Sequence, residues 1–143
     1  MKARDTCVDS VATLGALIEQ TIAYLNGRVQ FGVAIATFQA PRHRMADVYV
    51  RYESVRGMVE ECVRGDGLEH SAHLRHLRLM KLCVGDIGRF AAESAIQLHG
   101  GMGMSEEVLA ARLAQRLLAN EFRYGDRLFH ATALSAQAPG TTA

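Results

Sequence analysis

Apolar residues recur in steps of three and four along most of the chain, which is the spacing of one face of an α-helix. In the first stretch the repeat joins Val8, Val11, Leu14, Ile18 and Ile22. The helical stretches cover residues 5–26, the segment from Ala40 to a turn at 64–67, residues 68–99, residues 105–120, and a last one that is broken near Gly125 and fades by Ser135. The pattern therefore predicts three long helices and a shorter, split one.

We expect an all-α fold, an up-and-down four-helix-type bundle with long antiparallel helices, because short turns connect the successive helical stretches. Residues 1–136 would form this bundle, and the small and polar residues 137–143 a disordered tail. Gly27 and Gly32 interrupt the period within 27–41. This segment is expected to be a connector or a frayed helix end, and no strand is predicted.

Composition narrows the class of protein. A chain of 143 residues with a net charge of +1 is one domain and carries no excess of basic residues for nucleic acid or an anionic membrane. No apolar run approaches the roughly 18–20 residues of a membrane span, and the beginning of the chain lacks the apolar segment of a signal peptide. Three widely spaced cysteines are expected to be buried thiols. These observations favour a cytoplasmic protein without nucleic-acid or membrane partners.

A glycine-rich corner ends the third helical stretch, in the sequence AIQLHGGMGMSEE of residues 95–107. A glycine at a helix end supplies the left-handed residue that closes the last turn, so the segment predicts a helix cap at Gly100 and a new helix starting at Ser105. The same glycines leave the backbone without side chains. A bulky anion could therefore approach the peptide N–H groups where the next helix starts.

Two polar clusters give no sign of catalysis. The histidines His70, His73 and His76 lack the paired Glu-x-x-His motifs of a carboxylate-bridged metal bundle, so no metal site is expected. Asp126 and His130, four residues apart, could hydrogen-bond on one helix face, which as a structural pair needs no further role. No serine or cysteine is placed to complete a nucleophilic triad with them.

Arg28, Gln30 and Phe31 follow the first helical stretch and permit two interpretations. The arginine could satisfy the last carbonyl groups of the helix and complement its dipole. Alternatively, its guanidinium could bind a phosphate, while the amide and the aromatic ring contact a flat polar ligand. The local sequence does not decide between them.

Together, these segments resemble the C-terminal helical domain of acyl-CoA dehydrogenases. The segment YLNGRVQFGVAIATFQAPRHRMADVYV (24–50) is similar to the family motif Y-x-x-x-R-x-x-F-G followed by F-Q and A-D, and AIQLHGGMGMSEE is similar to the motif Q-x-x-G-G-x-G. Lys81 lies where the family's third long helix carries a lysine-containing turn. The order and spacing of both motifs match, and the resemblance covers nearly the whole chain.

The resemblance implies a share of an FAD site and no metal. Arg28, Gln30 and Phe31 match positions that hold the pyrophosphate and neighbouring parts of FAD, and Phe38 and Gln39 match the pair near its adenine side. On the third helix and its corner, the positions that reach FAD bound mainly by a neighbouring subunit are Gln97, Gly100 and Gly101.

The usual catalytic base is missing from its family position. The family carries a Glu in a Tyr-Glu-Gly-Thr motif near the C-terminus, and anchoring on Gly125 puts Tyr124 in its place. A tyrosine with an ordinary pKa near 10 is a poor base at neutral pH. Glu121 would need a shifted register, and no Glu precedes Glu19 in the first helix, where some relatives place the base. We therefore assign no catalytic residue. The Tyr-Gly-Asp pattern with a histidine four residues later resembles bacterial members that act on sterol side chains or rings.

The family's N-terminal helical domain and middle β-domain have no counterpart in these 143 residues. The resemblance thus implies the FAD-contacting and oligomerisation part of an enzyme for α,β-dehydrogenation of an acyl-CoA thioester, inactive alone. Its expected partners are further copies in a homodimer or tetramer, or a fuller dehydrogenase subunit in a hetero-oligomer, with electron-transfer flavoprotein serving the parent enzyme. The alternative is a non-catalytic helical module that supports an active partner.

Overall fold

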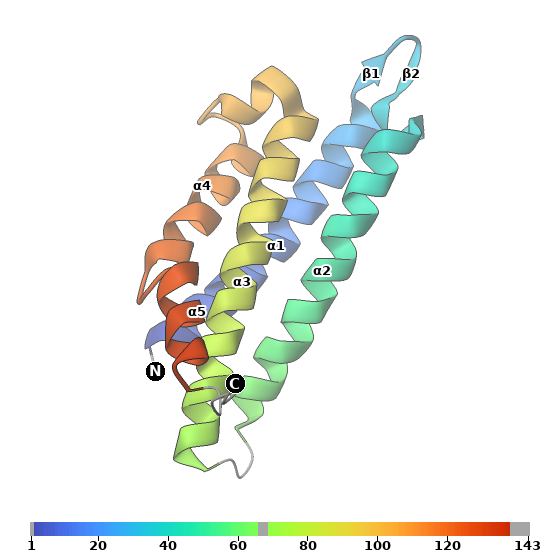
Figure 1. Cartoon of the computed structure of the whole chain (residues 1–143). Helices are drawn as coiled ribbons and strands as arrows, with labels where there is room; N and C mark the ends of the chain where they lie inside the picture. Colours follow the sequence, from blue (N-terminus) through green and yellow to red (C-terminus); the bar gives the residue numbers. More distant parts are fainter. Residues whose placement is uncertain (1, 66–68, 138–143) are drawn as a thin grey trace, which may run out of the picture.

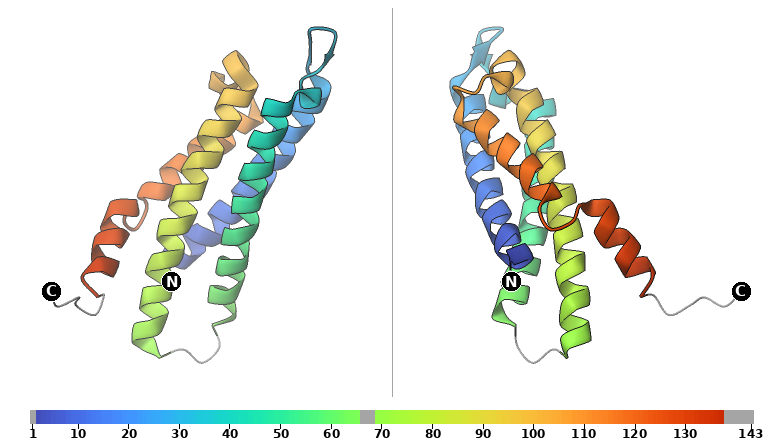
Figure 2. Two further views of the ribbon diagram at one scale, coloured as in Figure 1. Left: turned by 45° about the vertical axis from the view of Figure 1, so that its right-hand side comes forward. Right: turned by 90° about the vertical axis from the view of Figure 1, so that its left-hand side faces the viewer.

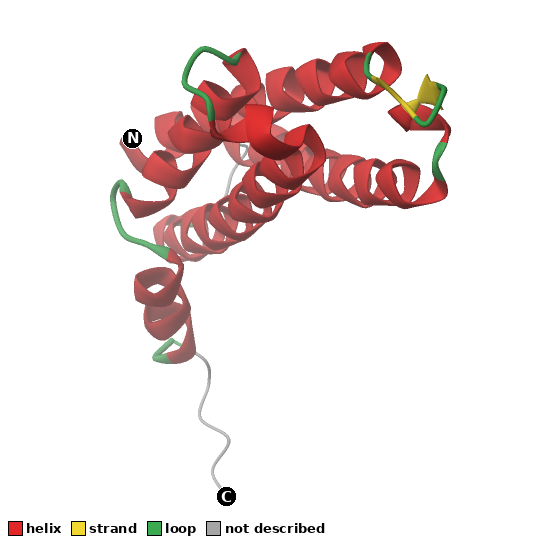
Figure 3. Ribbon diagram, turned by 90° about the horizontal axis from the view of Figure 1, so that it is seen from above, coloured by secondary structure: helices red, strands yellow, loops and turns green. Residues whose placement is uncertain are grey.

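The computed structural model describes residues 2–65 and 69–137, and within these ranges the protein is an up-and-down helical bundle (Figure 1). This arrangement confirms the predicted all-α bundle of long antiparallel helices. A short helix lies outside the bundle, packed on the third long helix (Figures 2 and 3). The helices are α1 (Lys2–Gly27), α2 (Gln39–Arg64), α3 (His70–His99), α4 (Leu109–Phe122) and the outer α5 (Arg127–Ser135).

The core lies along the bundle axis, where the apolar stripes of the helices meet. Leu14 and Leu17 of α1, Val55 of α2 and Met80 of α3 are almost completely buried. The apolar stripe of α2 faces this core, with Tyr52 only partly covered. The buried members of that stripe are Met45, Val48, Val55, Val59 and Cys62. None of the described helices is both long enough and apolar enough to cross a membrane.

A polar clamp joins α1 to α4. Asp9 accepts hydrogen bonds from the guanidinium of Arg116 and, at 2.7 Å, from the side-chain amide of Asn120. The hydrogen bond from Arg116 is the main reason that the pKa of Asp9 lies below its usual value. The clamp fixes the register of α1 against α4 at the solvent-exposed edge of their contact.

The connector between α1 and α2 forms a small hairpin, so the prediction of no strand is wrong here. Strands β1 (Val29–Gln30) and β2 (Val33–Ala34) pair antiparallel, and the 3-10 turn η1 (Ile35–Thr37) leads into α2. Phe31 and Gly32 both have positive φ, of 54° and 80°, as a two-residue hairpin turn of type I′ requires. Strands of two residues are too short to show a period of two in the sequence.

The glycine corner also differs from its prediction. The 3-10 turn η2 (Gly100–Met104) follows α3, and α4 starts at Leu109 rather than at Ser105. The Ser105 hydroxyl accepts a hydrogen bond from the Glu107 N–H at 3.4 Å, so it closes a local turn that resembles a helix start in sequence. Gly100 does end α3, but its φ of 59° and ψ of −136° lie outside the left-handed helical region.

The tail predicted at 137–143 lies almost wholly outside the described residues. Gln137 closes a turn on the Leu134 carbonyl at 3.1 Å, and residues 138–143 are not described. The turn predicted at 64–67 is described only in part, and there Gly65 ends α2 with a left-handed backbone.

Candidate functional site

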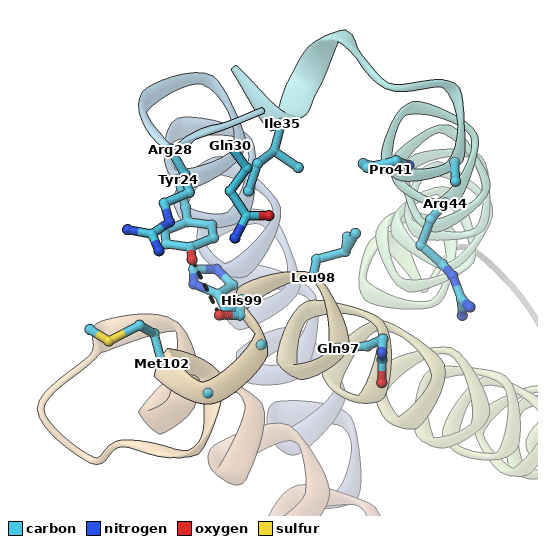
Figure 4. A pocket seen from close by; sticks show the side chains of 13 residues that line it. Tyr24, Arg28, Gln30, Ile35, Pro41, Arg44, Gln97, Leu98, His99 and Met102 are labelled. Carbon is cyan, nitrogen blue, oxygen red and sulfur yellow. Dashed lines mark hydrogen bonds between the residues drawn. The ribbon is translucent and has the colours of Figure 1, made fainter. Parts of the chain in front are cut away.

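An open groove of about 680 Å³ lies where the end of α1, the start of α2 and the end of α3 meet (Figure 4). The hairpin β1–β2 and the corner after α3 border it. Its lining combines two arginines and two glutamine amides with bare backbone and a few apolar side chains. The lining residues are Tyr24, Arg28, Gln30, Ile35, Ala40, Pro41, Arg44, Gln97, Leu98, His99, Gly100, Gly101 and Met102.

The groove gathers a majority of the site residues predicted from sequence. Arg28 and Gln30 reach it from the end of α1 and from β1, and Gln97, Gly100 and Gly101 reach it from the end of α3. About seventy residues of chain separate the two groups, and the antiparallel course of the helices brings them together (Figure 4).

The other predicted positions lie away from this groove. Phe31 sits in the hairpin turn with 92% of its surface exposed, and its ring meets the Phe38 ring edge-on at 6.3 Å between centroids. Gln39 opens α2 beside this pair and does not line the groove. These three residues form a separate, exposed edge next to the hairpin.

Arg28 does not act as a helix cap within the described residues. Its backbone N–H donates to the Tyr24 carbonyl at 2.8 Å, whereas its guanidinium makes no hydrogen bond or ion pair there. Arg44, on the opposite wall, donates to the Ser94 hydroxyl at 3.4 Å. Two positive charges therefore face one groove without a described carboxylate to neutralise them, an arrangement suited to an anion.

The backbone at the corner is open on the groove side. A methyl group built on Gly100 or Gly101 would meet no heavy atom within 4 Å, so space lies directly against the peptide groups. At Gly103 the same methyl would lie 2.6 Å from the Ile96 carbonyl oxygen. The corner thus uses Gly103 for close packing, while Gly100 and Gly101 leave open space beside the backbone.

Several groove residues were not predicted from the sequence, Arg44 among them. Two others are Tyr24 and His99. Their rings stack at 4.2 Å between centroids, and the Tyr24 hydroxyl donates to the His99 carbonyl at 3.2 Å (Figure 4). This pair ties the end of α1 to the end of α3 and forms the floor of the groove. The two residues are 75 positions apart, and nothing in either local pattern indicates the contact.

The His99 ring is buried without a described hydrogen-bond partner on either nitrogen. Burial disfavours the charged imidazolium, so the pKa of His99 is lowered from 6.5. The ring is therefore neutral at physiological pH. It contributes stacking and shape to the groove rather than charge.

At the other end of the bundle, the turn after α4 holds Tyr124, which the sequence motif is expected to place where the family carries its base. Tyr124 and Gly125 have positive φ, of 59° and 95°. The Lys81 ammonium donates to the Gly125 carbonyl at 3.2 Å, and the His130 ring nitrogen Nε2 lies 3.1 Å from the Tyr124 carbonyl. Buried side chains from α3 and α5 thus hold this unusual backbone.

The polar residues near this turn have structural partners. Glu121 is buried, with its carboxylate 2.7 Å from the Arg89 guanidinium, so it joins α4 to α3. The predicted Asp126–His130 side-chain pair does not form. Asp126 instead caps α5 by accepting the Phe129 N–H at 2.8 Å, because a carboxylate at a helix start satisfies an unpaired donor.

Comparison with known proteins identifies one family and its helical fold. A family model described as the C-terminal domain of acyl-CoA dehydrogenase matches residues 4–136. The acyl-CoA dehydrogenase IpdE2 of Mycobacterium tuberculosis is 36% identical over 90 residues, which are 63% of this chain and 26% of that protein. IpdE2 of Mycolicibacterium smegmatis is 31% identical over 99 residues, 69% of this chain and 30% of that protein.

Among solved structures, the FAD complex of PigA superposes with a TM-score of 0.78 at 25% identity, over 89% of this chain and 33% of PigA. The chain therefore spans only about a quarter to a third of the length of these relatives.

Proposed function

Because the chain belongs to the acyl-CoA dehydrogenase family and matches its C-terminal domain, we propose that it supplies part of an FAD site in an acyl-CoA dehydrogenase assembly. The parent reaction is the α,β-dehydrogenation of an acyl-CoA thioester. The bound flavin would supply the acceptor for the hydride that leaves the acyl chain.

The observation that carries this proposal is the groove that joins Arg28, Gln30 and Gln97 to the open backbone at Gly100 and Gly101. A guanidinium, side-chain amides and accessible peptide groups form the donor set that a diphosphate requires. Phe31, Phe38 and Gln39, at the exposed edge beside the hairpin, would contact other parts of the dinucleotide. The groove is open on one side, so the remaining contacts would come from another chain.

The contacts to FAD that this groove lacks indicate what kind of partner would complete the site. We propose a hetero-oligomer with a fuller dehydrogenase subunit, or a homodimer or tetramer of a longer form, with electron-transfer flavoprotein as the electron acceptor of the complete cytoplasmic enzyme. Support comes from the length of the relatives, of which this chain spans about a third or less.

A second candidate function, a non-catalytic assembly module, is favoured by the turn after α4. Tyr124 stands in the place of the base, and the nearby Glu121 is buried in an ion pair with Arg89. A partner would then supply the base. A complex that dehydrogenates an acyl-CoA only while the partner's base is intact would support this role.

The test of the flavin site is Arg28→Gln in the chain co-expressed with its partner subunit. Removing one charge-assisted contact to the diphosphate should weaken FAD binding about tenfold or more, measured as flavin occupancy and as the Kd for re-added FAD. Arg42→Gln is the matched control, since Arg42 lies exposed on the first turns of α2 and outside the groove.

Two results would contradict the proposal. Equal flavin occupancy in both variants would show that Arg28 does not touch the cofactor. A loss of thermal stability in Arg28→Gln without a change in FAD affinity would assign the residue to the end of α1 instead.

A further inference from the structure

A second cleft, of about 370 Å³, lies at the opposite end of α1 from the groove. The first turns of α1 form one side, and the end of α4 with the turn that follows forms the other. Figures 1 and 2 show the beginning of the chain beside this turn. The cleft therefore shares no lining residue with the groove of the proposed flavin site, although α1 contributes to both.

The charges in this cleft do not cancel. The Asp9 carboxylate already accepts hydrogen bonds from Arg116 and Asn120. Asp5 lies 3.8 Å from Arg4. Two further cations, Lys2 and Arg123, line the cleft and have no ion-pair partner within residues 2–65 and 69–137. The charge of Arg123 also contributes to the lowered pKa of Asp9, but neither cation forms an ion pair within the described residues. The cleft thus presents an ammonium and a guanidinium that are available to a ligand.

A phenol hydroxyl completes the set of donors. Tyr124 lines the cleft with 52% of its surface exposed. Its left-handed backbone carries a steric cost for a residue with a side chain. The carbonyl of Tyr124 lies 3.1 Å from the buried ring of His130, and that of Gly125 accepts from buried Lys81 at 3.2 Å. The fold therefore maintains a strained turn that holds the Tyr124 side chain at the cleft.

We propose that this cleft binds a small oxyanion, a carboxylate or a phosphate, through Arg123, Lys2 and Tyr124. The planar guanidinium of Arg123 donates two parallel hydrogen bonds to such an anion, the ammonium of Lys2 adds a point charge, and the Tyr124 hydroxyl donates a third bond. The cleft recognises the anionic group alone, so the site is independent of flavin binding.

The experiment titrates the 143-residue chain with glutarate, with inorganic phosphate and with neutral glutaramide, and follows the backbone amide resonances. We expect saturable shifts confined to residues 2–9 and 116–126 for at least one of the two anions, and no saturation with glutaramide. The anion that binds more tightly identifies the carboxylate or the phosphate as the recognised group.

Substitutions then assign the contacts. Arg123→Gln should weaken anion binding about tenfold or more, because it removes a charge-assisted pair of hydrogen bonds. Tyr124→Phe, which retains the ring, should weaken it about threefold. Arg112→Gln is the control, since Arg112 is exposed on α4, the helix that Arg123 follows, and does not line the cleft.

The proposal is overturned if neither anion saturates, if glutaramide binds as tightly as glutarate, or if Arg112→Gln and Arg123→Gln weaken binding equally. The last result would indicate general attraction to a basic helix. The flavin proposal fails or holds separately, through the Arg28 variant in the co-expressed complex.

Discussion

At Gly103 the backbone after α3 runs so close to the end of that helix that a methyl group would lie 2.6 Å from the Ile96 carbonyl oxygen. Gly103→Ala should therefore destabilise the protein by about 2 kcal/mol through overpacking. Gly101→Ala, where a methyl would meet no atom within 4 Å, should change stability by less than about 0.5 kcal/mol. Urea unfolding of the two variants measures the difference, and similar losses would contradict this account of the corner.

The two buried imidazoles make stability depend on pH. Burial is the main cause that lowers the pKa of both His99 and His130 from 6.5. As the pH falls below 6.5, the unfolded chain takes up these protons before the folded protein does, so the free energy of unfolding decreases. We expect the urea midpoint to be lower at pH 5.5 than at pH 7.5.

Single variants assign this effect to its residues. His99→Phe keeps the stacking on Tyr24 and removes the titrating group, so it should remove part of the pH dependence. His43→Phe, at an exposed position on α2, serves as the control. An unchanged pH dependence in His99→Phe would show that this buried ring does not contribute.

At the scale of the elements, Lys81 of α3 stabilises the end of α4. The buried ammonium of Lys81 donates to the carbonyls of Asn120, Glu121 and Gly125 at 2.8–3.2 Å. These include terminal carbonyls that a helix leaves without an internal partner. Lys81 therefore joins α3 to both α4 and the turn that leads to α5.

Lys81→Met keeps most of the side-chain volume and leaves these buried carbonyls unpaired. We expect a loss of about 2–3 kcal/mol in the free energy of unfolding, together with faster amide hydrogen exchange in α5 than in α1. Arg75→Met, at an exposed position on the same helix, should change little. Uniformly faster exchange throughout the bundle would argue against a local role for Lys81.

At the scale of the whole molecule, the bundle has a complete core but leaves large apolar side chains exposed where α4 meets α5. Phe122, Leu128 and Phe129 expose between 57% and 73% of their surfaces. Exposed apolar surface of this kind is typical of a contact with another protein. It agrees with the proposal that the chain works within a larger dehydrogenase assembly.

The open groove leads to a prediction about flavin content. We expect the chain purified alone to carry no stoichiometric flavin, because one side of the groove lacks the contacts that a second chain would supply. Co-expression with a subunit that supplies the other two domains should produce visible flavin absorbance in the purified complex. Stoichiometric flavin in the isolated chain would contradict this prediction.

The sequence by itself determined the helices, most of the buried stripes and the two family motifs, because helical periodicity and short motifs are local properties of the chain. Two members of the stripe predicted for α1, Val8 and Ile22, are instead exposed. It located the elements that border the groove and named Arg28, Gln30 and Gln97 before their positions in space were known. It was wrong about the hairpin and about the start of α4, where a strand of two residues or a serine turn gives too weak or too ambiguous a local signal.

Only the tertiary structure decided which residues meet. The stacking of Tyr24 on His99, the Lys81 contacts to the end of α4 and the cleft that joins Lys2 to Arg123 connect residues that are tens of positions apart. Such contacts depend on how the helices are aligned and rotated against one another. That alignment follows from the packing of the whole core, so no local segment of the sequence predicts it.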